Sequence, residues 1–132
     1  MVLVDTSVWI RSLAGRAPYL AGLDRLLDRD EVVGHELIYG ELLIGDRGGR
    51  ENLLSAYERF QQASLVPHSE VVAFVRARAL HGRGVGWIDV HLLASAIVER
   101  LPLWTVDPRL ARVADELGVA YHAQVAKPGE SS

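Results

Sequence analysis

The sequence predicts an α/β protein in which a central parallel sheet lies between two layers of helices. Short aliphatic runs alternate with longer segments whose apolar residues recur at helical spacing, which is typical of this three-layer class. The chain has 132 residues, of which 49% are hydrophobic, so it can bury one substantial core. We therefore expect one domain over residues 1–125. The tail, residues 126–132, contains lysine, proline, glycine and serine, a composition that predicts disorder.

The expected elements follow in chain order. Strands are predicted where the aliphatic runs are short, at 2–4, 31–34, 65–67, 103–106 and 119–121. Helices are predicted where the apolar spacing is three or four, beginning after Asp5 and then at 18–27, 35–44, 51–62, from 69 towards 82, from 87 and from 108. The glycine-rich segments 45–49 and 82–86 predict loops.

The composition excludes several classes of site. The chain contains no cysteine, which excludes disulfides, cysteine-based zinc sites and thiol nucleophiles. The N-terminal apolar run is too short for a signal peptide, and no stretch reaches the length of a membrane span. We therefore expect a cytoplasmic protein that does not bind a membrane.

The charge leaves the question of a nucleic-acid partner open. The net charge of −3 argues against a polyanion as ligand. If four of the acids hold divalent cations, however, their negative charges are offset, and the net charge of the remaining residues becomes about +1. All basic residues except Lys127 are arginine, which suits phosphate contacts but is equally explained by a genome-wide bias.

Three aspartates at expected helix starts have structural explanations. Asp5 precedes Thr6 and could cap a helix, Asp107 precedes Pro108, the favoured first helical residue, and Asp89 falls in a first turn. Glu41 differs, because none of its helical neighbours at three or four positions is charged. A carboxylate on such an apolar face needs a compensating charge from elsewhere in the fold.

The expected topology brings these acids together. Asp5 and Asp107 each follow a strand and lie at the carboxyl edge of the sheet, where open α/β folds build their sites. Asp89 shares a helix side with Leu93 and Ala96, which turns it inward. Clustered carboxylates repel one another unless cations lie between them, and oxygen ligands of this kind suit Mg²⁺ or Mn²⁺. Such sites catalyse phosphodiester hydrolysis.

Segments that contain these acids resemble the PIN-domain ribonucleases, and among them the VapC-type toxins of toxin-antitoxin systems. The likeness covers nearly the whole chain and is carried by four segments, 2–10, 38–45, 82–96 and 103–110, each of which holds one acid. The resemblance implies a PIN-like fold, Mg²⁺ or Mn²⁺ as cofactor and endonucleolytic cleavage of RNA. It also implies a homodimer and neutralisation by a VapB-type antitoxin whose C-terminal segment enters the active-site groove.

The resemblance also implies roles for individual residues. Asp5 and Asp89 would be the main metal ligands, and Glu41 and Asp107 would complete the catalytic site directly or through water. Ser7 occupies the place of a small polar residue that supports the acids, and Thr6 would help to hold Asp5.

Further residues could contact the substrate. Thr6 and Ser7, together with Arg83 in the glycine-rich loop and Arg109 and Arg112 on the helix after Asp107, are expected to bind RNA, although a solvated surface explains the arginines equally well. Trp9 and Trp87 could stack on bases or fill the core. His91 lies two positions from Asp89 and is expected to face away from the site.

Alternative functions fit less well. A haloacid-dehalogenase-like phosphatase needs a second aspartate where this chain has Ser7, and a receiver domain needs a lysine near its third acidic segment, whereas the only lysine is Lys127. The remaining alternative is a non-catalytic PIN-like module that binds RNA or a protein.

Overall fold

The computed structural model describes residues 1–123, so the predicted domain end at 125 and the predicted tail lie outside the described residues. Three short parallel strands, β1 (Val2–Val4), β2 (Val32–Val33) and β3 (Leu103–Trp104), form a sheet in the order β2-β1-β3. β1 pairs with both neighbours, with Val2 opposite Val32 and Leu3 opposite Leu103. The central parallel sheet predicted from the sequence is therefore confirmed.

Two predicted strands are wrong or reduced. Residues 65–67 form no strand, because Leu65 is exposed and Pro67, which lacks an N–H, leads directly into a helix. Residues 119–121 contribute only an isolated bridge between Ala120 and Leu103. A second isolated bridge, between Gln62 and Gly34, extends the opposite edge of the sheet.

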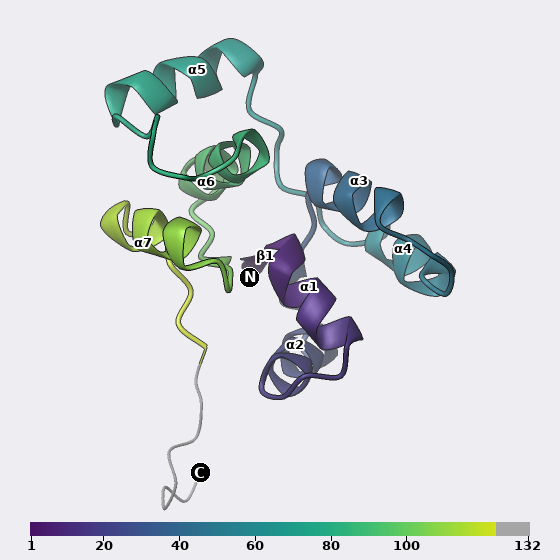
Figure 1. Cartoon of the computed structure of the whole chain (residues 1–132). Helices are drawn as coiled ribbons and strands as arrows, with labels where there is room; N and C mark the ends of the chain where they lie inside the picture. The colour runs from purple at the N-terminus through teal and green to yellow at the C-terminus, as the bar shows by residue number, and fades with distance from the viewer. Residues whose placement is uncertain (124–132) are drawn as a thin grey trace, which may run out of the picture.

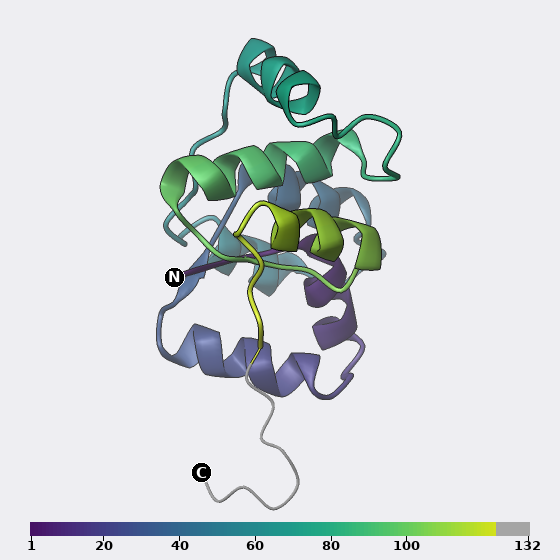
Figure 2. The same cartoon turned by 90° about the vertical axis from the view of Figure 1, so that its left-hand side faces the viewer.

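The helices form the outer layers. They are α1 (Thr6–Leu13), α2 (Tyr19–Asp28), α3 (Glu36–Ile44), α4 (Glu51–Tyr57), α5 (His68–Ala77), α6 (Trp87–Glu99) and α7 (Pro108–Glu116). Figure 1 shows α1 to α4 on one side of β1 and α6 and α7 on the other. α5 is the outermost helix and lies over α6 (Figures 1 and 2). The arrangement is the expected three-layer sandwich.

α4 ends five residues before the predicted boundary at 62. After Tyr57 the chain turns, and the amide of Gln62 donates hydrogen bonds to the backbone carbonyls of Tyr57 and Phe60. Gln62 thereby reaches the edge of the sheet instead of continuing the helix, so a contact distant in sequence overrides the local pattern.

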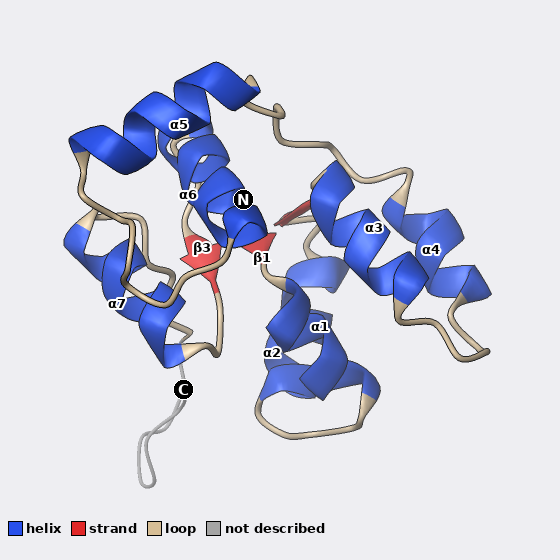
Figure 3. Ribbon diagram, turned by 45° about the horizontal axis from the view of Figure 1, so that its top comes forward, coloured by secondary structure: helices blue, strands red, loops and turns tan. Residues whose placement is uncertain are grey.

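The core is mainly aliphatic, includes the aromatic side chains of Trp9, Tyr57 and Trp104, and is centred on the sheet, which lies in the middle of the molecule (Figure 3). Leu3 and Val4 of β1 are fully buried, as are Ile38 of α3 and Leu92 of α6. No helix within residues 1–123 is long and apolar enough to cross a membrane.

The strand order creates a switch point in the sheet. The chain passes from β1 to β2 on one side and then returns across the sheet to β3 on the other side of β1. In open parallel sheets, ligands bind in the crevice outside the carboxyl ends of the two strands where the winding reverses. Here those ends are followed by Asp5 after β1 and by Thr105 to Asp107 after β3.

His35 connects the two helices that carry Glu41 and Asp89. It is fully buried at the N-cap of α3, where its Nδ1 accepts the N–H of Leu37 at 3.1 Å. Because Nδ1 accepts, Nε2 carries the proton and donates to the Ser95 hydroxyl of α6 at 3.0 Å. Ser95 in turn donates to the carbonyl of Ser64 at 2.7 Å. This chain of hydrogen bonds fixes α3 against α6.

The pKa of His35 makes this link sensitive to pH. Burial, with a smaller contribution from His91, lowers the pKa of His35 from 6.5 to about 4. The unfolded chain therefore binds a proton more readily than the folded chain between these pH values, and the free energy of unfolding should fall as the pH drops from 6.5 towards 4.

In His35→Asn, which keeps a capping side chain, the fall in the free energy of unfolding should be smaller when it is measured by urea unfolding. His81→Asn, at an exposed histidine, is the control and should retain the full fall. Equal pH dependence in His35→Asn and the wild type would contradict this account.

Candidate active site

Asp5 is buried at the carboxyl end of β1 and is held by two hydroxyl groups. Its Oδ2 accepts hydrogen bonds from Ser7 at 2.6 Å and from Thr105 at 2.8 Å. Asp5 occupies the N-cap position of α1, but its side chain makes no capping hydrogen bond. The helix-cap explanation of Asp5 is therefore wrong. Both hydroxyls bind the same oxygen, and Oδ1 has no hydrogen-bond partner among residues 1–123.

Glu41 lies on α3 opposite the start of α1. Thr6 donates a hydrogen bond to its Oε1 at 2.7 Å. Thr6 therefore holds Glu41, and the expectation that it holds Asp5 is wrong. Burial raises the pKa of the Glu41 carboxyl, the Thr6 hydrogen bond lowers it, and the nearby charges of Asp5 and Asp89 raise it further. Glu41 is thus close enough to two other acids to be affected by their charge.

Asp89 lies in the first turn of α6 and is half-buried. Its Oδ2 accepts the backbone N–H of Gly86 at 2.9 Å, which fixes the side chain at the helix start. Burial raises the pKa of Asp89, the Gly86 hydrogen bond lowers it, and the charges of Asp5 and Asp107 raise it. The helix-start explanation of Asp89 is confirmed, and this position also brings its carboxylate within range of the charges of Asp5 and Asp107.

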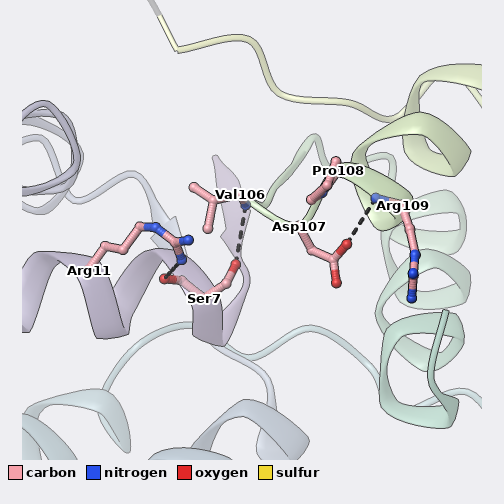
Figure 4. A pocket seen from close by; sticks show the side chains of 6 residues that line it. All are labelled: Ser7, Arg11, Val106, Asp107, Pro108 and Arg109. Carbon is pink, nitrogen blue, oxygen red and sulfur yellow. Dashed lines mark hydrogen bonds between the residues drawn. The ribbon is translucent and has the colours of Figure 1, made fainter. Parts of the chain in front are cut away.

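Asp107 caps α7 as its sequence context predicts, and its Oδ1 accepts the N–H of Arg109 at 2.9 Å. It also lines a cavity of about 420 Å³, together with Ser7, Arg11, Val106, Pro108 and Arg109. Figure 4 shows the Asp107 carboxylate and the Arg109 side chain projecting to the same side of the chain at the start of α7. Asp107 therefore combines a capping role with a place on the wall of an open cavity.

The four acids form one electrostatic group. The charges of Asp5 and Asp89 raise the pKa of Glu41, and the charges of Asp5 and Asp107 raise the pKa of Asp89. Within residues 1–123, neither of the two ion pairs includes any of the four, so their charges are not offset by an arginine or a histidine. The fold thus places these acids within range of one another's charge.

The donor set fits a hard divalent cation that keeps part of its water shell. Mg²⁺ is usually bound through one or two carboxylates and several waters. Among the described residues, no three acidic or imidazole side chains are arranged to enclose one ion. The Oδ1 of Asp5, which accepts no hydrogen bond within residues 1–123, nevertheless provides one oxygen ligand. Asp89 provides a second carboxylate, and because its pKa is raised, a cation would stabilise its charged form. Carboxylate donors of this kind suit Mg²⁺ or Mn²⁺.

Thr105 is a site residue that the sequence pattern did not reveal. Its hydroxyl donates to Asp5 and accepts the N–H of Asp107 at 3.1 Å, and it lies 3.3 Å from the Ser7 hydroxyl. It was assigned to the strand at 103–106, but β3 ends at Trp104. A polar residue between the last buried strand residue and a helix-capping aspartate was the available signal.

The residues predicted to bind substrate have unequal surroundings. Ser7 and Thr6 use their hydroxyls on Asp5 and Glu41, which places them within the acidic cluster. Arg83 forms a bidentate ion pair with Glu116, with N–O distances of 2.6 and 2.9 Å. Arg109 and Arg112 are exposed and take part in no ion pair within residues 1–123.

The two tryptophans have different environments. Trp9 is 3% exposed and stacks with Phe60 in the core. Trp87 is 45% exposed and contacts His91 edge to face. His91 is buried beneath it and makes no hydrogen bond with the described acids.

Comparison with known proteins places the chain in a family. Residues 2–116 match the PIN domain. The chain is 41% identical over 126 residues to proteins named "Ribonuclease VapC32" from two strains of Mycobacterium tuberculosis, CDC 1551 / Oshkosh and H37Rv, an alignment that covers 95% of this chain and 99% of each relative.

A solved structure supports the same assignment. The crystal structure of FitAcB from Neisseria gonorrhoeae superposes with a TM-score of 0.60 at 25% identity, and the match covers 91% of this chain and 95% of that one. Together with the parallel sheet and its acidic edge, these matches show that the chain belongs to the PIN-domain family and is of the VapC type.

Proposed function

We propose that this protein is a metal-dependent endoribonuclease that acts as the toxin of a toxin-antitoxin pair. The observation that carries the proposal is the group of four acids near the switch point of the sheet, which neutral donors hold and none of which forms an ion pair within residues 1–123. The 41% identity to a protein named ribonuclease over nearly the whole chain supports RNA as the substrate.

The chemistry follows from how the side chains are held. When bound, a Mg²⁺ or Mn²⁺ ion supplies Lewis acidity that neutralises the phosphate and activates a water for attack. Asp5 and Asp89 would hold the ion, since one has a free oxygen and the other a raised pKa. Glu41 and Asp107 would complete the site directly or through water, and Asp107 lies on the cavity wall beside Arg109. Arg109 would bind a phosphate oxygen there.

The biological setting remains part of the proposal. An antitoxin of the VapB type and a homodimer are expected from the resemblance, and a cytoplasmic location is expected from the sequence; the similarity to a VapC protein supports the antitoxin. The alternative is a PIN-like module that binds RNA or a protein without cleaving it, and removal of the acids separates the two functions.

The first test removes the expected metal ligands. The double variant Asp5→Ala and Asp89→Ala should reduce hydrolysis of a broad RNA panel in Mg²⁺ to the uncatalysed background, because the two main ligands of the ion are then lost. The matched control is Asp24→Ala and Asp28→Ala on α2, where both residues are exposed, and it should cleave as the wild type does. Equal cleavage by the Asp5 and Asp89 variant would refute the catalytic assignment, and no cleavage by the wild type would favour the binding module.

The second test concerns the uncompensated charge of Glu41. Because burial and its acidic neighbours raise its pKa, the charged form destabilises the fold at pH 7 when no metal is bound. Glu41→Gln keeps an acceptor for Thr6, so it should raise the Tm in EDTA by a few degrees while lowering activity in Mg²⁺. Glu36→Gln, at an exposed position of the same helix, should do neither. A lower Tm for Glu41→Gln in EDTA would indicate a structural partner for the charge.

The third test concerns Thr105 as a positioning residue. Thr105→Val keeps the shape of the side chain but removes the hydroxyl that orients Asp5 and bonds Asp107. The Mg²⁺ concentration for half-maximal activity should rise by about 10- to 100-fold, which is typical when a group that orients a metal ligand is lost. Thr105→Ser should restore it, because it restores the hydroxyl. A purely structural role predicts instead a lower Tm in Thr105→Val with an unchanged Mg²⁺ requirement.

A further inference from the structure

A second cavity adjoins the one that contains Asp107 and shares Pro108 and Arg109 with it. It has a volume of about 340 Å³ and is lined by Arg83, Pro108, Arg109 and Arg112. Three of its four lining residues are arginines, and none is acidic. Because Arg109 lines both cavities, it lies between the acidic cavity and this arginine-lined one.

The three arginines differ in what already binds them. Arg83 is held on Glu116 by two hydrogen bonds, an interaction that raises the pKa of Arg83 and lowers that of Glu116. This pair neutralises the nearby carboxylate, which would otherwise repel an anion, and ties the glycine-rich loop to α7. Arg109 and Arg112 are exposed and have no carboxylate within ion-pair distance among residues 1–123, so their guanidinium groups are available to a ligand.

Gly84 determines where Arg109 lies. Its backbone has a φ of +80°, and a Cβ at this position would come within 2.7 Å of the Arg109 Cδ and 3.2 Å of its Nε and Nη1. The Arg109 side chain therefore lies directly against the loop, which only a glycine permits. Gly82 in the same loop has a φ of +74°, but a Cβ there would have nothing within 4 Å. Gly84 and Gly82 thus have similar φ angles but differ in their contact with Arg109.

We propose that the cavity between the glycine-rich loop and α7 is a second phosphate subsite, in which Arg109 and Arg112 bind a backbone phosphate of RNA next to the one that is cleaved. Gly84 positions Arg109 for this contact, and Arg83 serves as the anchor of the loop rather than as a ligand of RNA. The inference rests on the proposed ribonuclease function, because it assigns the RNA a path. On this path the RNA backbone runs from the acidic cluster past Arg109 into the second cavity. Guanidinium groups suit this role, since they bind phosphate oxygens through paired N–H donors.

The test compares RNAs that can and cannot fill the second subsite. A dinucleoside monophosphate has one phosphate, which the cleavage site takes, so Arg112→Ala should lower kcat/KM for it much less than for a longer RNA. For a hexanucleotide, Arg112→Ala should raise KM by about tenfold or more with little change in kcat. Arg25→Ala, at an exposed arginine of α2 that forms no ion pair within residues 1–123, removes the same charge elsewhere and should change neither value.

A binding measurement checks the contact without cleavage. In EDTA, the logarithm of the binding constant for the hexanucleotide should fall less steeply with the logarithm of salt concentration in Arg112→Ala than in the wild type. The expected decrease in slope is about 0.7, which corresponds to one phosphate contact on a single strand. Gly84→Ala should raise KM for the hexanucleotide because it displaces Arg109, whereas Gly82→Ala should not.

The outcomes separate this inference from the function on which it rests. If the wild type cleaves RNA but Arg112→Ala leaves both the hexanucleotide KM and the salt slope unchanged, the second subsite is refuted and the ribonuclease proposal stands. If Gly84→Ala and Gly82→Ala behave alike, the positioning role of Gly84 is refuted. If the wild type neither binds nor cleaves any RNA, the proposed function fails, and the subsite fails with it.

Discussion

The structure depends on holding several carboxylates at one edge of the sheet without neutralising them. Each acid is fixed by uncharged donors: hydroxyls for Asp5 and Glu41, and backbone N–H groups for Asp89 and Asp107. Neutral donors orient a carboxylate but leave most of its charge in place, whereas an arginine would cancel it. The uncompensated charge is the property that a divalent cation requires.

The rest of the fold keeps these donors in position. β1 lies at the centre of the sheet, so Asp5 is placed by a strand that is buried on both sides and paired with two neighbours. Glu41 and Asp89 lie on different helices, and the buried hydrogen bond between His35 and Ser95 connects those helices close to the sheet. Because a buried polar network is costly when incomplete, this link restricts how far α3 and α6 can move apart.

The same separation of roles appears among the cations. Arg83 is used internally on Glu116, whereas Arg109 and Arg112 remain available beside the acidic cavity. The acids, which attract cations, therefore lie beside the arginines, which attract phosphate, and the two groups form no ion pair with each other. This holds even for Asp107 and Arg109, which are two residues apart. Asp107 is bonded instead to the Arg109 backbone, which leaves the guanidinium group free to extend towards Gly84.

The sequence by itself determined the three-layer class, most element positions, the Asp107 cap and the four acids, because these are recorded in apolar spacing and in contacts a few residues apart. Only the tertiary structure decided what holds each acid. The Thr6 to Glu41 bond spans 35 residues and the Thr105 to Asp5 bond spans 100, and no local pattern specifies such partners. The same reason accounts for the pairing of Arg83 with Glu116 and for the turn of Gln62 to the sheet edge. Long-range hydrogen bonds become definite only when the strand order and helix packing bring their ends together.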